Sequence, residues 1–208
     1  MNTKTLIFDF DGTLADTHHH IIEISNRLAD EFGYGKILPE DIDSFKRQTS
    51  QEVIKRLKVP IMKIPAILVK AKKEFQKGID QLESFPGVKE TLNTLKSKGI
   101  SLGILSSNNP ENIHTFLNNH QMDVFDFIHS TSKVWSKHTC LKKVIKEKHL
   151  LEEDVIYIGD EIRDILASKK LKLKVAAVAW GYNHISTLQE YQPDFLIQKP
   201  EELLDLIQ

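Results

Sequence analysis

The 208-residue chain has few of the features that mark secreted, membrane or nucleic-acid-binding proteins. Cys140 is its one cysteine, so an intrachain disulfide is excluded and nothing points to an oxidising compartment. Its apolar runs are much shorter than the roughly 20 residues that span a bilayer. Lys and Arg (28) nearly balance Asp and Glu (29), so the chain has no excess of positive charge that would attract nucleic acid or an anionic membrane. We expect a cytoplasmic protein with no nucleic-acid or membrane partner.

Short apolar runs alternate with amphipathic stretches along most of the chain. The runs predict buried strands at Thr5–Phe8, Ser101–Leu105, Val155–Ile158, Val175–Ala179 and Phe195–Ile197. The stretches predict helices at Val88–Lys98, Pro110–Asn118, Thr139–Lys148, Ile162–Lys170 and Glu201–Leu206. The first strand begins so early that we expect no signal peptide. This alternation predicts an α/β fold with a doubly wound parallel sheet, covered by helices on both faces.

The segment from residue 15 to residue 82 differs because it shows helical patterns and no convincing strand. The clearest helical patterns cover Ile21–Phe32, Gln51–Leu57 and Ile64–Phe75. We therefore expect a helical cap subdomain of residues 15–82, inserted into a core domain of residues 1–14 and 83–208.

Two carboxylates follow the first predicted strand, at Asp9 and Asp11. Side chains alternate along a strand, so both carboxylates project to one side while Phe10 points the other way. Close carboxylates repel each other unless a cation or a shared proton intervenes. Magnesium favours a few carboxylates together with water and phosphate oxygens as its ligands. A magnesium ion between the two carboxylates would offset their repulsion. The competing interpretation is that the pair caps the helix that follows.

Polar residues also end two later strands, and chemistry in parallel sheets sits at the carboxyl ends of strands. The segment 106–108 (Ser-Ser-Asn) offers hydroxyl and backbone N–H groups that can hold phosphate oxygens, although this composition is also common in turns. Asp160, Glu161 and Asp164 follow Gly159, where acidic residues would also suit the start of a helix.

The segment DFDGTLAD at residues 9–16 resembles the first signature of the haloacid dehalogenase-like hydrolases, Asp-x-Asp-x-Thr after the first strand. The resemblance implies a Rossmann-type core and a magnesium-dependent phosphatase in which Asp9 attacks phosphorus and becomes an aspartyl phosphate. Asp11 would protonate the leaving oxygen and then activate the hydrolytic water. A carboxylate at the position of Asp11 is typical of phosphotransferases in this family, because its dehalogenases lack one.

The second and third signatures of the family have matches in the same order along the chain. Ser106 best matches the second, with Ser107 and Asn108 as accessory contacts for the phosphate. Lys137 resembles the third better than Lys133 does, because it precedes a predicted helix. By this resemblance Lys137 would neutralise the phosphate and the nucleophile.

The fourth signature has the form Gly-Asp-x-x-x-Asp and matches residues 159–164. The resemblance implies that Asp160 joins Asp9 and Asp11 as a magnesium ligand. Glu161 or Asp164 would lie behind the ligands and orient water molecules or Lys137.

The segment 180–182 (Trp-Gly-Tyr) resembles phosphoglycolate phosphatase-like members, which implies a small phosphorylated metabolite as the substrate. A pyrophosphatase and a sugar-phosphate mutase stay open within the enzymes. A phosphate-accepting signalling module and a regulatory binding protein on the same type of fold are the alternatives outside them. The sequence does not indicate the oligomeric state.

Two further features attract attention without predicting a site. Adjacent residues on a helix point in different directions, so His18, His19 and His20 do not predict a transition-metal site, although one could face the substrate cleft. The segment 169–174 lacks the glycine that family members commonly carry between this helix and the next strand. That absence makes the shape of the loop uncertain from sequence.

Overall fold

The structure, a computed structural model, describes residues 4–131 and 137–207. Six parallel strands form one sheet in the order β3-β2-β1-β4-β5-β6. They are β1 (Thr5–Phe8), β2 (Ser101–Ser106), β3 (Phe127–Ser130), β4 (Val155–Gly159), β5 (Lys174–Val178) and β6 (Phe195–Ile197). The predicted doubly wound parallel sheet is confirmed.

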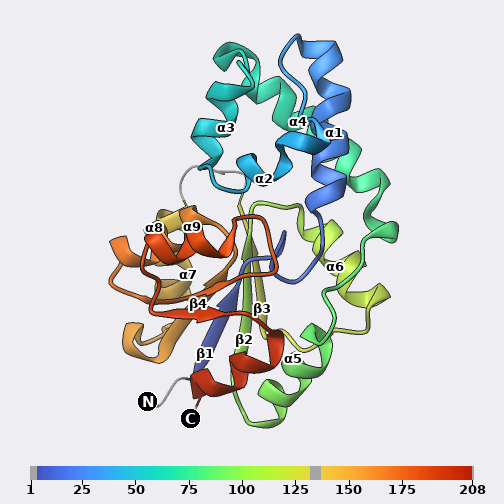
Figure 1. The fold of residues 1–208 in the computed structure, drawn as a ribbon. Helices are drawn as coiled ribbons and strands as arrows, with labels where there is room; N and C mark the ends of the chain where they lie inside the picture. Colours follow the sequence, from blue (N-terminus) through green and yellow to red (C-terminus); the bar gives the residue numbers. More distant parts are fainter. Residues whose placement is uncertain (1–3, 132–136, 208) are drawn as a thin grey trace.

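Helices cover both faces of this sheet (Figure 1). α5 (Val88–Ser97) and α6 (Pro110–Asn119) pack on one face, whereas α7 (Lys137–Glu147), α8 (Ile162–Lys170) and α9 (Ile185–Glu190) pack on the other. Successive residues of β1 serve the two faces in turn, since Leu6 and Phe8 join one hydrophobic cluster and Ile7 joins the other. A strand buried on both sides reads as a continuous apolar run, which is why β1 is visible in the sequence.

Three elements differ from the sequence-based expectation. β3 is short, half-buried and paired with β2 alone at the sheet edge, so its residues do not form an apolar run. α9 has only six residues, too few to show a helical period. The helix expected at the C-terminus is a 3₁₀ helix, η5 (Pro200–Ile207). Among the helices of the described residues, none is long and apolar enough to cross a membrane.

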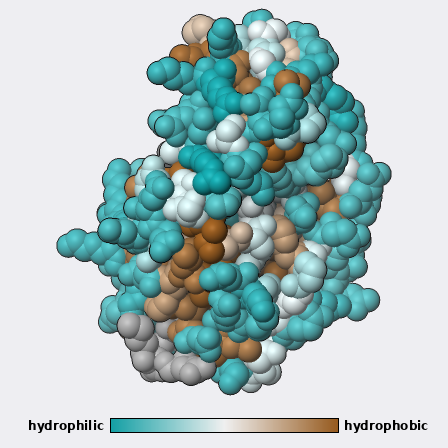
Figure 2. All heavy atoms as spheres, in the orientation of Figure 1, coloured by the Kyte–Doolittle hydropathy of each residue, from teal (hydrophilic) through white to brown (hydrophobic). Residues whose placement is uncertain are grey.

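Between β1 and β2 the chain forms a helical region, here called the cap region (residues 18–81). It contains α1 (His18–Phe32), η1 (Pro39–Asp41), α2 (Ile42–Phe45), α3 (Ser50–Arg56), η2 (Ile61–Lys63), α4 (Ile64–Lys77) and η3 (Ile79–Gln81). In Figure 1 it lies above the carboxyl ends of the strands. Figure 2 shows a mostly hydrophilic surface on this side, with hydrophobic surface near the junction with the cap region and further down the lower part. The domain boundaries at residues 15 and 82 stay a prediction.

Candidate active site

The carboxylates of Asp9 and Asp11 lie just beyond the end of β1. Asp9 is 2% exposed, and its Oδ1 accepts a hydrogen bond of 2.8 Å from the backbone N–H of Phe10. Asp11 is half-buried, and Asn108 Nδ2 lies 3.1 and 3.3 Å from its two carboxylate oxygens. Burial and the neighbouring Asp9 carboxylate raise the pKa of Asp11 to about 7. Asp11 can therefore carry a proton near neutral pH.

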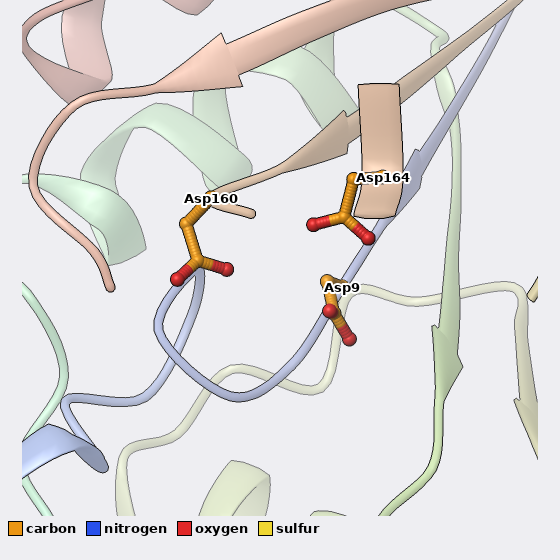
Figure 3. Close-up of side chains that lie close together, drawn as sticks. All are labelled: Asp9, Asp160 and Asp164. Atoms are coloured by element: carbon orange, nitrogen blue, oxygen red, sulfur yellow. The ribbon is translucent and has the colours of Figure 1, made fainter. Parts of the chain in front are cut away.

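Three buried carboxylates, those of Asp9, Asp160 and Asp164, converge at the ends of β1 and β4 (Figure 3). One ligand oxygen from each lies within 4.8 Å of the others. Asp160 accepts hydrogen bonds from Thr13 Oγ1 at 3.0 Å and from the backbone N–H of Tyr182 at 2.7 Å. These three residues are here called the acidic group. Its third member is Asp164, whereas the metal site predicted from the sequence had Asp11 as its third ligand.

Two glycines let the chain approach Asp160 closely. Gly12 has a φ of +74°, and a Cβ there would lie 2.1 Å from Asp160 Oδ2. A Cβ on Gly181 would lie 2.3 Å from the Cβ of Asp160. Any larger residue at either position would therefore push its loop away from the acidic group.

Lys137, the first residue of α7, joins two members of the acidic group. Its Nζ contacts the carboxylates of both Asp9 and Asp164, and only 11% of its side chain is exposed. Burial lowers the pKa of Lys137, but the charges of Asp164 and Asp9 outweigh it and raise the pKa well above its usual value. Lys137 is thus held charged. The alternative Lys133 lies outside the described residues.

The polar segment after β2 reaches the same place. Ser106 is buried, and its Oγ accepts a hydrogen bond of 3.0 Å from the backbone N–H of Asn108. Asn108 holds Asp11 and is itself held by Asn112, whose Nδ2 donates to Asn108 Oδ1 at 2.9 Å. Ser107 lines the same cavity as Asp11. The structure therefore brings the predicted residues 106–108 beside Asp11.

Arg163 and Asn183 are site residues that the sequence reasoning missed. Arg163 Nη2 lies 2.5 Å from Glu161 Oε1 and 4.0 Å from Asp9 Oδ2, which brings a second cation near the acidic group. The buried Asn183 accepts from the backbone N–H of Ile162 at 2.9 Å, at the start of α8. The position of Arg163 inside the fourth signature was the available signal, whereas nothing in the sequence marks Asn183.

The three histidines at the start of α1 point in different directions, as expected from helical geometry. His18 lines the cavity above the acidic group. His19 lies 3.1 Å from Glu23, and the ring of His20 packs against Phe75. Their side chains therefore do not form a shared site.

The balance of charge tests whether a metal ion suits this place. The carboxylates are those of Asp9, Asp11, Asp160, Glu161 and Asp164, and the cations beside them are Lys137 and Arg163. Burial raises the pKa of Asp160 well above its usual range, and the negative charges of Glu161, Asp164 and Asp9 add to this effect. A hard divalent cation with oxygen ligands fits such a set. Asp164 accepts from Lys137 and from the backbone N–H of Glu161 at 3.0 Å, so it also anchors the cation that lies beside Asp9.

Comparisons with known proteins agree on one family. Residues 6–178 match the family model described as haloacid dehalogenase-like hydrolase. Phosphoglycolate phosphatase of Synechococcus elongatus is 31% identical over 205 residues, which cover 98% of this chain and 97% of that protein. Pyrophosphatase PpaX of Bacillus cereus is 26% identical over 212 residues, which cover 100% of this chain and 97% of that protein.

A solved structure shows the shared fold. A haloacid dehalogenase-like family hydrolase of Streptococcus pneumoniae aligns with a TM-score of 0.84 and 24% identity, covering 100% of this chain and 99% of that one. The predicted family and the predicted enzyme class, a phosphatase-type hydrolase, are confirmed, and the signalling-module alternative loses its support. The chain belongs to the haloacid dehalogenase-like hydrolases.

Proposed function

We propose that the protein is a magnesium-dependent phosphatase that hydrolyses a small phosphomonoester through an aspartyl phosphate on Asp9. The observation that supports this most is the contact of Lys137 with both Asp9 and Asp164. It places a positive charge beside the attacking oxygen and beside the position that phosphoryl oxygens would occupy. Phosphoryl transfer depends mainly on such positioning and charge neutralisation.

In the first step a carboxylate oxygen of Asp9 attacks phosphorus, and the bond from phosphorus to the leaving oxygen breaks. Asp11 donates its proton to that oxygen, so the alcohol leaves uncharged. The pKa of Asp11, raised to about 7, supports its being protonated at the start. Asn108 holds the Asp11 carboxyl group in place.

In the second step Asp11, now a carboxylate, accepts a proton from a water molecule. The water oxygen attacks phosphorus, and the bond between phosphorus and Asp9 breaks. Inorganic phosphate is released, and Asp11 is protonated for the next cycle. Ser106 and Ser107 lie where a hydroxyl group or a backbone N–H could hold the phosphoryl oxygens during both steps.

Asp9 and Asp160 would hold the magnesium ion, and the side chain of Asp11 as a third ligand stays a prediction. Bound magnesium would offset the negative charge of the phosphoryl group. Asp164 would position Lys137, while Glu161 would position Arg163. These groups are buried and already paired, so little reorganisation is needed when substrate arrives.

Similarity to a phosphoglycolate phosphatase supports phosphoglycolate-like phosphomonoesters as the first substrates to test. Similarity to pyrophosphatase PpaX supports inorganic pyrophosphate as the second candidate. A sugar-phosphate mutase would require an aspartyl phosphate that outlives attack by water. The cytoplasmic location expected from the sequence stays a prediction.

Phosphate release from 4-nitrophenyl phosphate tests the proposal directly. We expect turnover with Mg²⁺, its loss on chelation, and a drop of at least about 10³-fold in kcat for Asp9→Asn. Asp123→Asn removes an exposed carboxylate and serves as the matched control. Absence of phosphate release with every divalent metal would overturn the phosphatase, and full activity in Asp9→Asn would remove Asp9 from the role of nucleophile.

A further inference from the structure

A cavity of about 400 Å³ rises from the acidic group into the cap region. Asp11, Asn108 and Asp160 line its lower end, where the reaction is proposed to occur. Nine apolar residues of α1, α3 and α4 line its upper walls. The cavity therefore joins a polar, charged lower end to an apolar upper chamber.

The chamber is present in a structure in which the cap region is hydrogen-bonded to the core. Asn183 Nδ2 donates to the carbonyl oxygens of Lys46 at 2.9 Å and of Gln48 at 3.1 Å. Ser50 Oγ donates to Glu161 Oε2 at 3.1 Å, beside the acidic group. The space thus lies between docked parts and does not result from their separation.

The chamber presents apolar surface that is partly exposed. Ile21 is 41% exposed, one of the more exposed large hydrophobic residues, and it lines this cavity. Val53, Ile54 and Ala71 line it from the facing helices. Transfer of an apolar group from water onto such walls is favourable.

The same chamber offers little for a second anionic group. Its basic lining residues are Lys72, His18 and Arg163. Arg163 is already paired with Glu161, and burial together with the positive charge of Lys46 lowers the pKa of His18. A carboxylate or a second phosphate carried by the substrate would meet Lys72 as its main counter-charge, with mostly apolar walls around it.

We infer that the substrates of this site are phosphomonoesters of alcohols that are mainly apolar and larger than glycolate. The phosphoryl group would lie at the acidic group and the alcohol in the chamber lined by Ile21, Val53, Ile54 and Ala71. This inference rests on the proposed phosphatase function and names the substrate class for the same site.

A series of n-alkyl phosphates from methyl to hexyl tests the inference, because their leaving groups differ little in basicity. With Mg²⁺ we expect kcat/KM to rise about two- to fourfold for each added methylene until the chamber is filled. We expect phosphoglycolate and pyrophosphate to be poorer substrates than butyl phosphate. A flat or falling series, or a preference for either anionic substrate, would overturn the inference.

Binding of n-alkylphosphonates, measured by calorimetry with Mg²⁺, separates this inference from the proposed function. These compounds have no ester oxygen to cleave, so their affinity is independent of catalysis. Affinity that rises with chain length in a protein inactive on every ester would overturn the function and keep the apolar chamber. Affinity that is independent of chain length would overturn the chamber, whatever the activity.

Two substitutions on α4 give a matched comparison. Ala71→Leu adds volume inside the chamber and should lower the ratio of hexyl to methyl phosphate kcat/KM about tenfold. Ala66→Leu adds the same volume at an exposed position outside it and should leave the ratio unchanged. Ile21→Thr, at a half-exposed site where folding is little affected, should lower the ratio a few-fold. Unchanged ratios in both chamber variants would overturn the inference.

Discussion

At the scale of single residues, Lys137 holds the buried charges together. It contacts Asp9 and Asp164, and its side chain is almost fully enclosed. Such a contact has two consequences that can be measured separately. In the proposed mechanism it supports catalysis by placing charge at the reacting group, and in the fold it offsets carboxylates that would otherwise be buried without a partner.

Replacing Lys137 by methionine keeps an unbranched side chain as far as Cε and removes the charged Nζ. We expect kcat to fall about 10²- to 10⁴-fold and the free energy of unfolding to fall by about 3 kcal/mol, because two buried carboxylates lose their cation. Lys137→Arg should restore little activity, since a planar guanidinium does not fit the place of an ammonium. Lys143→Met on the same helix is the control, because that side chain is 61% exposed. Activity in Lys137→Met equal to the control would remove Lys137 from the mechanism.

The raised pKa of Asp11, about 7, predicts how stability depends on pH. A carboxyl group whose pKa is raised by folding stabilises the fold while protonated, and this contribution is lost as pH rises through the folded-state pKa. For metal-free protein we expect Asp11 to lower the free energy of unfolding by about 2 to 3 kcal/mol between pH 5 and pH 8. Asp164, with a pKa raised to about 6, acts in the same direction over the lower half of this range.

Urea unfolding at pH 5 and pH 8 in a chelator measures this loss. Asp11→Asn should reduce the difference between the two pH values, whereas the exposed Asp123→Asn should not. Mg²⁺ should also reduce it, because the ion stabilises the ionised carboxylates. An unchanged pH difference in Asp11→Asn would contradict the assignment.

At the scale of elements, the loop between α8 and β5 has a lysine with a left-handed backbone conformation where family members commonly carry a glycine. Lys172 is exposed and has a φ of 58°, the left-handed conformation that glycine adopts without cost. The loop thus keeps the left-handed turn that ends α8, although the segment 169–174 has no glycine to make it. The local shape is imposed by the helix and strand on either side.

Lys172→Gly should therefore stabilise the protein. Relief of the left-handed strain outweighs the greater freedom of glycine in the unfolded chain, and we expect a gain of about 0.5 to 1 kcal/mol. Lys170→Gly, at the last residue of α8, should instead destabilise by up to about 1 kcal/mol. Thermal unfolding of the two variants gives the comparison, and a loss of stability in Lys172→Gly would contradict the prediction.

At the scale of the whole molecule, Asn183 ties the cap region to the core. Its side-chain Nδ2 donates to the carbonyl oxygens of Lys46 and Gln48, and its Oδ1 accepts from the backbone N–H of Ile162. Its backbone N–H donates to the carbonyl oxygen of Asp160 at 3.2 Å. The side-chain amide of Asn183 therefore links the cap region to the start of α8, and its backbone N–H adds a bond to the residue proposed to bind magnesium.

Asn183→Ala would remove the hydrogen bonds to the carbonyl oxygen of Gln48 and from the backbone N–H of Ile162, whereas the carbonyl oxygen of Lys46 still accepts from the backbone N–H of His184 at 2.9 Å. We expect the free energy of unfolding to fall by about 1 to 3 kcal/mol and kcat/KM to fall about tenfold or more, because two of the hydrogen bonds that hold the cap region over the site are lost. Asn118→Ala, at an exposed position of α6, controls for the loss of an amide. Unchanged kcat/KM in Asn183→Ala would mean that catalysis does not depend on this tie.

The sequence by itself determined the family, the sheet and the positions of Asp9, Asp11 and Asp160. Buried parallel strands are apolar throughout, and the residues that end them are close in space because parallel strands end at one edge of the sheet. Tertiary structure alone decided that Asp164 completes the acidic group, that Arg163 and Asn183 reach it, and that helices of the cap region line an apolar chamber. These depend on contacts between residues distant in the chain, such as Asn183 with Lys46, which no local pattern records. β3 belongs with them, because its partner β2, and not its own composition, makes it a strand.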